Sequence, residues 1–282
     1  MRIANLAGRL VLVAADERLV DVHTASGGRF GPTVQDVYAQ WVPFREWAAA
    51  VDLSGAGAQV YDAARLGSPA PAPRQVFAVG LNYTAHAAES KLAVPEHPPV
   101  FTKFPSSLTG PEGEIALPDG DVDWEVELVV VIGAEAVGVR RERAWDHVAG
   151  LSVGQDISER RRQLTGPAPQ FSMGKSHPGF GPIGPVLVTA DEFADPTDLE
   201  LGCLVNGEQM QKGRTSEMLF PVDELIARLS AVVTLYPGDV VFTGTPAGVG
   251  LGRDPQRFLH DGDELTSYVE GIGRMHHRLV AR

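Results

Sequence analysis

The pattern of apolar residues is clearest in residues 123–133, where two glutamates precede a continuous and mostly β-branched run. A run of this kind predicts a strand that is buried on both faces. Because side chains alternate between the two faces of a strand, Glu125 and Glu127 are expected to point the same way as Val129 and Val131. Two carboxylates on one face of a buried strand repel each other, so they require a cation, a shared proton or contact with water.

The first 70 residues are predicted to form a small unit of their own. A helical pattern begins at Thr33, a favourable N-cap residue, and continues to Val51 with an interruption near Pro43. A stretch rich in proline and alanine, residues 67–73, then predicts an extended and stiff linker. The strands expected in this unit are 2–6, 8–14 and 18–24. The chain is therefore expected to divide into a small N-terminal α+β domain, 1–70, and a larger domain, 71–282.

The larger domain is predicted to be rich in β-structure. Asn206-Gly207 between two extended runs is typical of a type I′ hairpin turn. The 31 glycines and 21 prolines of the chain indicate many turns. Strands or hairpins are expected over 75–80, 100–104, 123–133, 151–156, 186–189, 199–213, 239–244 and 262–280, and helices over 81–89, 141–148 and 222–229. The predicted fold class is α+β and rich in β.

Composition and charge exclude several classes of function. The 282 residues carry a formal net charge of −12, which argues against nucleic acid or an anionic membrane as the main partner. No apolar run reaches the roughly 18 residues of a membrane span, and the first residues lack a secretory pattern. The single cysteine, Cys203, excludes an internal disulfide and a cysteine-based zinc cluster. A cytoplasmic protein is therefore expected.

Acidic residues are the first candidates for a functional site. Glu125 and Glu127 offer hard oxygen ligands, which suit Mg²⁺, Mn²⁺ or Ca²⁺ better than zinc, although a strand with a solvated start is the alternative. Asp156 ends a short predicted strand and is a possible third ligand. Arg160 and Gln163 follow it by four and seven residues, on one face of a helical turn, and a basic solvated helix is the alternative there.

A histidine and a glutamate are the second candidates. His86 and Glu89 lie three residues apart on a predicted helix, so their side chains share a face. A carboxylate beside an imidazole raises its basicity and fixes its tautomer, as a general base requires, whereas an ordinary surface pair is the alternative. The prolines of residues 95–99 predict an irregular segment that could serve as a lid. Lys175 stands between small residues, ahead of a glycine- and proline-rich stretch.

Three short motifs match known patterns only in part. Residues 150–154 fit G-x-S-x-G, but a helix is predicted before them where a nucleophile elbow needs a strand. Residues 174–176 resemble the end of a P-loop, but Pro169 occupies the required glycine position. Residues 248–252 lack the G-x-G-x-x-G spacing and a following helix. Neither ATP nor NAD binding is expected.

Five longer motifs occur in a characteristic order. They are Gly80-Leu81-Asn82-Tyr83-Thr84-Ala85-His86-Ala87-Ala88-Glu89, Trp124-Glu125-Val126-Glu127-Leu128, Gln155-Asp156-Ile157-Ser158-Glu159-Arg160, Gly174-Lys175-Ser176 and Thr243-Gly244-Thr245-Pro246-Ala247-Gly248-Val249-Gly250. In this order they resemble the fumarylacetoacetate hydrolase superfamily, in its bacterial acylpyruvase and 2-hydroxyhepta-2,4-diene-1,7-dioate isomerase branch. The resemblance covers roughly residues 75–282, and residues 1–70 resemble the extra N-terminal domain of many bacterial members.

The resemblance implies a mixed β-sandwich roll, usually a homodimer, that binds one divalent cation, commonly Mg²⁺ or Mn²⁺. It implies Glu125, Glu127 and Asp156 as metal ligands, His86, Glu89 and Lys175 as catalytic residues, and Arg160, Gln163 and Thr245 as substrate ligands. In this arrangement His86 and Glu89 belong to a lid, and Thr245 contacts the substrate carboxylate.

The reaction expected from this set is hydrolysis of a C–C bond in a 1,3-diketo or 2-oxo acid, such as an acylpyruvate or a fumarylpyruvate-like acid. A hard cation would polarise the carbonyl and stabilise the enolate formed on cleavage, while His86 deprotonates the attacking water. Two alternatives stay open: an isomerase or decarboxylase of 2-oxo diacids, and a metal-stabilised binding protein without turnover. The sequence departs from the family after Ser176, where relatives more often continue Phe-Asp. His177 stands there instead, as a second base or as an ordinary loop histidine.

Overall fold

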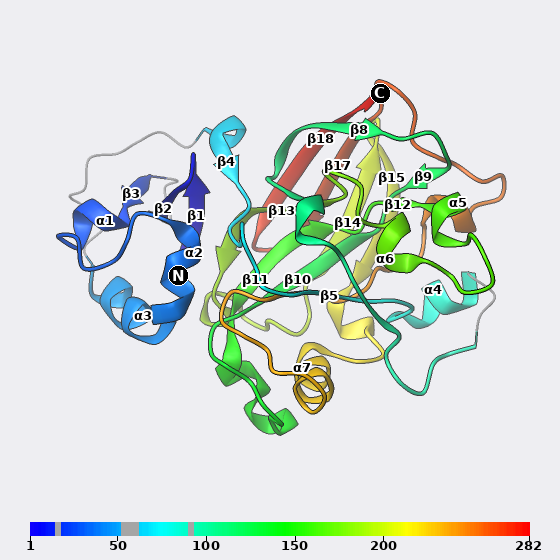
Figure 1. Ribbon diagram of the computed structural model, residues 1–282. Coiled ribbons are helices and arrows are strands. Elements are labelled where there is room, and N and C mark those ends of the chain that lie inside the picture. The colour runs from blue at the N-terminus through cyan, green and yellow to red at the C-terminus, as the bar shows by residue number, and fades with distance from the viewer. Residues whose placement is uncertain (15–17, 52–61, 90–92) are drawn as a thin grey trace.

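The structure is a computed structural model that describes residues 1–14, 18–51, 62–89 and 93–282. It contains an eleven-stranded mixed sheet, a five-stranded sheet and a two-stranded sheet (Figure 1). The predicted β-rich α+β fold class is confirmed. No helix within these ranges is long and apolar enough to cross a membrane.

The large sheet has the order β3-β2-β1-β13-β11-β10-β16-β5-β6, with β4 on β1 and β7 on β13. Its strands are β1 (Arg2–Leu6), β2 (Arg9–Val13), β3 (Leu19–Asp21), β4 (Leu66–Gly67), β5 (Val76–Val79), β6 (Val100–Thr102), β7 (Leu108–Thr109), β10 (Val126–Ile132), β11 (Val148–Gln155), β13 (Gly181–Val188) and β16 (Val240–Phe242). The antiparallel register of β10 and β11 pairs Val126 with Gln155. The first residues of β10 therefore lie beside the last residues of β11, which is where the acidic candidates are.

The second sheet has the order β15-β14-β17-β18-β8. Its strands are β8 (Glu112–Leu117), β14 (Glu200–Val205), β15 (Glu208–Arg214), β17 (Glu264–Val269) and β18 (Gly273–Ala281), and the two-stranded sheet consists of β9 (Val122–Asp123) and β12 (Ser158–Glu159). Asn206 and Gly207 join β14 to β15 with φ values of 53° and 80°, so the predicted type I′ turn is confirmed.

The helices are short and lie outside the sheets. The α-helices are α1 (Val22–Ala25), α2 (Val34–Val37), α3 (Trp41–Ala50), α4 (Thr84–Glu89), α5 (Arg160–Gln163), α6 (Phe171–Gly174) and α7 (Val222–Ser230). The 3-10 helices are η1 (Tyr38–Gln40), η2 (Ala63–Arg65), η3 (Pro105–Ser107), η4 (Arg141–His147), η5 (Ala190–Glu192), η6 (Thr215–Glu217) and η7 (Gly250–Gly252).

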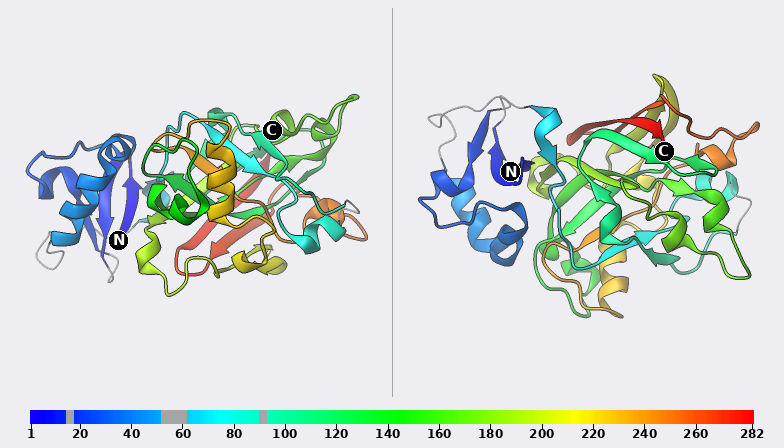
Figure 2. Two further views of the ribbon diagram at one scale, coloured as in Figure 1. Left: turned by 90° about the horizontal axis from the view of Figure 1, so that it is seen from below. Right: turned by 45° about the horizontal axis from the view of Figure 1, so that its top comes forward.

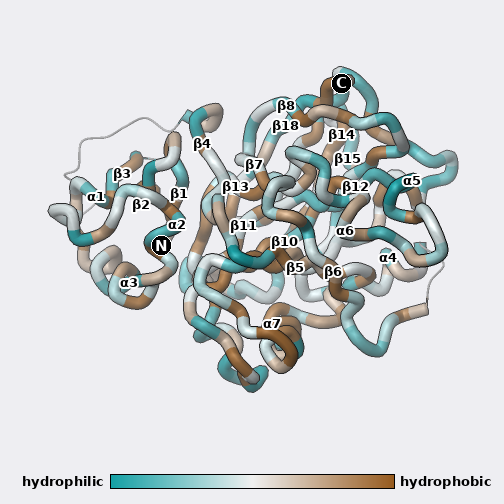
Figure 3. The backbone as a smooth tube through the Cα atoms, in the orientation of Figure 1, coloured by the Kyte–Doolittle hydropathy of each residue, from teal (hydrophilic) through white to brown (hydrophobic). Residues whose placement is uncertain are grey.

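Strand β10 has an apolar core on each of its faces. Val126, Leu128 and Val130 join the core that fills the space between the two sheets. Val129 and Val131 join a second core on the other face of the large sheet. Figure 3 shows hydrophobic residues along β10 and along β5, which belongs to the same sheet. The predicted burial of this strand on both faces is therefore confirmed, and the two cores fix its position firmly.

Residues 1–70 contribute strands to the large sheet. Strand β1 pairs with β13, with Arg2 opposite Val188 and Ile3 opposite Leu187. In all three ribbon views the first strands and helices lie at one end of the molecule (Figures 1 and 2). The division at residue 70 stays a prediction, and the sheet runs without a break across that point of the sequence.

Several predicted boundaries are wrong, among them that of the strand expected over 151–156, which begins at Val148, and the interruption expected near Pro43, which lies inside α3. The strand expected over 123–133 is split, because Asp123 belongs to β9 and pairs with β12 before β10 begins at Val126. The strand expected over 18–24 ends at Asp21, whose carboxylate caps α1 by accepting a hydrogen bond from the main chain of Thr24. The helix expected to reach residue 148 is η4, which ends at His147 because β11 already begins at Val148. The strand expected over 186–189 begins at residue 181 instead, because β7, β11 and β1 pair with it.

A buried histidine makes the fold sensitive to acid. His277 in β18 is 1% exposed, and its Nε2 lies 3.0 Å from Gly110 O. Burial lowers the pKa of His277 to about 4, from an ordinary value of 6.5. The neutral form is therefore favoured in the folded state, and its stabilising effect is lost as the pH falls from about 6.5 to about 4.

We expect His277→Gln to remove much of this acid sensitivity, because glutamine binds no proton in that range. Wild-type protein should lose on the order of 3 kcal/mol more than the variant between pH 7 and pH 4. Urea unfolding at both pH values measures the difference. His260→Gln at an exposed position is the matched control, and an equal acid loss in wild type and His277→Gln would contradict the assignment.

Candidate metal centre and active site

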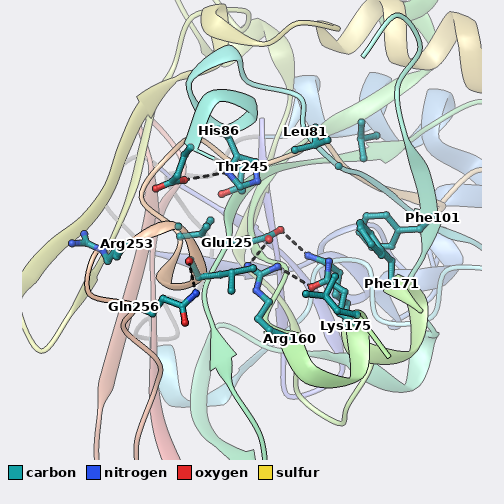
Figure 4. A pocket seen from close by; sticks show the side chains of 18 of the residues that line it. Leu81, His86, Phe101, Glu125, Arg160, Phe171, Lys175, Thr245, Arg253 and Gln256 are labelled. Atoms are coloured by element: carbon teal, nitrogen blue, oxygen red, sulfur yellow. Dashed lines mark hydrogen bonds and ion pairs between the residues drawn. The ribbon is translucent and has the colours of Figure 1, made fainter. Parts of the chain in front are cut away.

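One cavity of about 780 Å³ collects seven of the nine predicted site residues. They are His86, Glu89, Glu125, Arg160, Gln163, Lys175 and Thr245. In Figure 4 Glu125, Arg160 and Lys175 meet in the middle of the cavity, with Phe101 and Phe171 on one side and Arg253 and Gln256 on the other. Residues from stretches far apart in the sequence therefore share one space.

The two remaining candidates, Glu127 and Asp156, join Glu125 in a buried cluster. One oxygen from each of the three carboxylates lies within 4.8 Å of the other two. Glu125 stands just before β10, Glu127 within it and Asp156 directly after β11. The main-chain N–H of Asp156 donates to Glu125 O at 2.9 Å, which fixes the two strand ends together. The structure thus brings together all three predicted metal ligands.

Two lysines contact Asp156 from different sides. Lys175 Nζ donates to Glu125 Oε2 and Asp156 Oδ2, both at 2.8 Å, and to Ser158 Oγ at 2.7 Å. Lys103 Nζ donates to Asp156 Oδ1 at 2.6 Å and also to the main-chain oxygen of Lys175. The Asp156 carboxylate is therefore fixed in orientation by a cation on each oxygen.

Arg160 holds the other end of the cluster. Its Nη2 lies 2.7 Å from Glu125 Oε1 and 2.6 Å from Asp123 Oδ1, and its Nη1 donates to Gln163 Oε1 at 2.9 Å. Its Nε is buried and has no hydrogen-bond partner among the described residues. Arg160 also lines the cavity, so its guanidinium group brings positive charge to that space.

The two glutamates differ in their electrostatic surroundings. Burial would raise the pKa of Glu125, but the charges of Lys175 and Arg160 outweigh it and lower the pKa to about 2. Burial, Asp156 and Glu125 together raise the pKa of Glu127 well above its usual range. Gly244 N donates to Glu127 Oε2 at 2.7 Å, which compensates only in part. The cluster is therefore short of positive charge at Glu127.

A divalent cation fits this cluster. Four buried carboxylates, including Asp123, face three buried cations, Lys103, Arg160 and Lys175, so the group carries one net negative charge when all four carboxylates are ionised. An ion of charge +2 would leave one net positive charge. The donors are all carboxylate oxygens, which suit Mg²⁺, Mn²⁺ or Ca²⁺. Glu125, Glu127 and Asp156 are the residues that could hold it.

Helix α4 brings His86 and Glu89 to the cavity. His86 Nδ1 lies 3.3 Å from Glu89 Oε2, and Gly248 N donates to both oxygens of Glu89 at 3.0 and 3.1 Å. A Cβ on Gly252 would lie 2.4 Å from Glu89 Cγ, so glycine is required there for the glutamate to approach. The predicted pair therefore forms, and the glycine-rich loop fixes its carboxylate.

Comparison with known proteins identifies the family. The model of the fumarylacetoacetate (FAA) hydrolase C-terminal family matches residues 75–280. The chain belongs to the fumarylacetoacetate hydrolase family. The resemblance seen in the five sequence motifs is thereby confirmed.

Relatives of this chain carry several activities in their names. The human mitochondrial protein named oxaloacetate tautomerase FAHD2A is 45% identical over 215 residues, which are 76% of this chain and 68% of the relative. A Mycobacterium smegmatis protein provisionally named HpcE has a crystal structure that is 59% identical, with a TM-score of 0.95 over 100% of this chain and 99% of that one. Maleylpyruvate hydrolase from Sphingobium sp. SYK-6, solved with manganese(II) and pyruvate, is 30% identical, with a TM-score of 0.82 over 100% and 99%. Members of the fumarylacetoacetate hydrolase family are enzymes, so this chain is one too.

Two charged residues of this family member were missing from the sequence prediction. Lys103 follows β6 and is 1% exposed. A lysine directly after a short apolar strand does not by itself indicate a buried site residue, so the sequence alone did not identify it. Asp123 is fully buried; it accepts a hydrogen bond from Leu251 N at 2.8 Å, and burial raises its pKa to about 6. Lys103 contacts Asp156 and Asp123 contacts Arg160, so both residues help to fix the positions of predicted site residues.

Thr245 and His177 have surroundings that the sequence did not predict. The Thr245 hydroxyl donates to Val126 O at 2.8 Å, so its only proton is turned away from the cavity that Thr245 lines. His177 does not line the cavity; its ring packs against Phe180 at a centroid distance of 5.0 Å.

Proposed function

We propose that the protein is a divalent-metal-dependent hydrolase that cleaves a C–C bond of a 1,3-diketo or 2-oxo acid of the acylpyruvate or fumarylpyruvate type. The observation that carries this proposal is the His86–Glu89 pair, which lines the same cavity as the carboxylate of Glu125 and the ammonium group of Lys175. A general base, a cation and a set of metal ligands are the parts that hydrolysis of such a bond requires.

The proposed metal ligands are Glu125, Glu127 and Asp156, with Mg²⁺ or Mn²⁺ as the ion. When bound, such an ion polarises a substrate carbonyl and stabilises negative charge on its oxygen. It would also turn the net charge of the cluster from negative to positive, which favours an anionic substrate.

The chain's own residues supply the proton transfers. Because Glu89 accepts the Nδ1 proton of His86, the Nε2 atom keeps its lone pair and can take a proton from water. The hydroxide so formed adds to the carbonyl distal to the carboxylate, the C–C bond breaks, and its electron pair passes to the enolate of the 2-oxo acid. In this proposal Lys175 protonates that carbon, while Arg160, Gln163 and Thr245 hold the substrate.

A substrate panel tests the proposal directly. Acylpyruvates, fumarylpyruvate and oxaloacetate would be incubated with the protein and Mg²⁺ or Mn²⁺, and released pyruvate would be measured with lactate dehydrogenase. We expect pyruvate from at least one 1,3-diketo acid, and none after chelation of the metal. Absence of pyruvate from every diketo acid would overturn the proposal.

Replacing His86 is expected to lower the rate of hydrolysis. His86→Gln removes the base but retains similar size, so kcat for diketo acid cleavage should fall by about 10²- to 10⁴-fold. Steady-state kinetics with the best substrate of the panel would measure this loss. His97→Gln, outside this cavity, is the matched control, and a variant His86→Gln with undiminished kcat would contradict the assigned role.

An isomerase or decarboxylase of 2-oxo diacids is the second candidate. The identity of 45% to a protein named as an oxaloacetate tautomerase favours it. Enol–keto exchange needs a proton donor and acceptor but no attacking water, and His86 and Lys175 could provide both. Conversion of enol-oxaloacetate followed by its ultraviolet absorbance, without pyruvate release, would favour this candidate. The homodimer and the cytoplasmic location stay predictions.

A further inference from the structure

Gln211 is a buried amide that connects the two sheets at the cavity. It lies in β15 and is 1% exposed. Its Oε1 accepts a hydrogen bond from Val126 N at 2.9 Å, at the residue between Glu125 and Glu127. Its Nε2 donates to Thr245 Oγ1 and Pro246 O, both at 2.7 Å. One side chain therefore joins the strand of the metal ligands to the loop that follows β16.

The loop attached to Gln211 contacts both halves of the site. Gly244 N donates to Glu127 in the carboxylate cluster, and Gly248 N donates to Glu89 beside His86. A Cβ on Gly248 would lie 2.2 Å from Met210 O, so the loop also packs tightly on β15. The metal ligands and the His86–Glu89 pair therefore both depend on the position of this loop.

The hydrogen bonds allow only one orientation of the Gln211 amide. Val126 N can only donate and Pro246 O can only accept, so the carbonyl oxygen must face β10 and the NH₂ group must face the loop. Thr245 has one hydroxyl proton, which goes to Val126 O. Gln211 fills one acceptor position of that hydroxyl, so only an acceptor position is left to face a ligand.

We propose that Gln211 is a positioning residue that fixes the polarity of Thr245, so that the Thr245 hydroxyl accepts a hydrogen bond from the substrate. This inference rests on the proposed function, because it concerns how that site meets a 2-oxo acid. An acceptor here favours a protonated oxygen, such as an enol hydroxyl, and repels a carboxylate.

Two simple probes differ in the relevant group. Lactate carries a hydroxyl group, which can donate a hydrogen bond to Thr245. Pyruvate carries a carbonyl group at the same position, which cannot donate. Calorimetry with Mn²⁺-loaded protein would give the ratio of their affinities. Gln211→Met releases Thr245, so it should reduce the relative preference for lactate by about 10-fold, the effect of one hydrogen bond. Gln40→Met, exposed and outside the cavity, should leave the ratio unchanged.

A double-mutant cycle decides whether Gln211 acts through Thr245. In a Thr245→Val background, Gln211→Met should change the ratio by less than about 3-fold, because the hydroxyl is already absent. An equal change in both backgrounds, or no change in either, overturns the proposal. If Gln211→Met does not fold, Gln211→Asn serves instead, since it is too short to reach both Val126 and Thr245.

The double-mutant cycle can also be measured through protein stability, without any ligand. This measurement distinguishes failure of this inference from failure of the proposed function. If wild-type protein binds neither probe, the proposed function fails. The melting temperatures of metal-free Gln211→Met, Thr245→Val and the double variant then test the contact itself. We expect a coupling of about 2 °C or more, and additive shifts would overturn the assignment.

Discussion

Replacing Glu127 with glutamine should abolish metal-dependent turnover while leaving the metal-free protein at least as stable as wild type. The carboxylate is buried, and Asp156 and Glu125 raise its pKa well above the usual range. Glutamine has the same shape but no charge, so it removes this repulsion. Its carbonyl can still accept the hydrogen bond from Gly244 N, and its NH₂ group can donate to the neighbouring carboxylates.

The loss of function should be large because one of three ligands is removed. Metal affinity is expected to fall by on the order of 100-fold or more, and kcat by about 10³-fold. Calorimetric titration with Mn²⁺ and thermal unfolding with and without the ion measure both effects. Glu135→Gln, exposed beyond the end of the same strand, is the matched control. Retained Mn²⁺ affinity in Glu127→Gln would place the ion elsewhere.

Lys103→Met should be the most destabilising of the substitutions considered. The Lys103 side chain is fully buried and pairs with Asp156 Oδ1 at 2.6 Å. Methionine fills similar space but leaves a buried carboxylate with one cation fewer, and breaking a buried ion pair from one side costs about 3–5 kcal/mol. Burial lowers the pKa of Lys103, because the charged ammonium group loses its hydration inside the protein. This desolvation cost reduces the net stabilisation that the ion pair provides. We therefore expect a loss near the lower end of this range.

The metal provides an internal test of this explanation. A divalent ion at Asp156 supplies positive charge, so the destabilisation by Lys103→Met should become smaller when Mg²⁺ is present in excess. Urea unfolding with Mg²⁺ and with a chelator would show the difference. Lys212→Met is the matched control, because this lysine is 60% exposed in its pair with Glu200 and should matter by less than about 1 kcal/mol. An equal loss with and without Mg²⁺ would mean that Lys103 acts through packing alone.

The candidate site could be predicted from sequence only where its residues belong to local patterns. Glu125 and Glu127 were found because a strand places alternate residues on one face, and His86 and Glu89 because a helix places residues three apart together. Lys103 and Gln211 follow no such pattern. Their partners Asp156 and Val126 lie 53 and 85 residues away in the sequence, so only the folded chain shows the contact.

The fold shows the same limit at the ends of its elements. Strand β10 and the hairpin at Asn206-Gly207 were predicted because burial and turn chemistry are encoded locally. Strand β13 was predicted too short, because Pro182 and Pro185 indicate a loop when they are considered alone. Pairing with strands from other parts of the chain holds these residues in the sheet. Tertiary contacts thus override local preference where the partner is distant.

The pairing of β1 with β13 limits how this architecture can change in evolution. A module attached by a free tether can be gained, exchanged or lost in one step. Here the first strand covers the main-chain groups of residues 187 and 188, and uncovering a strand edge invites self-association. A lineage that discarded the first 70 residues would first have to protect that edge, so both parts of the chain are expected to be inherited together.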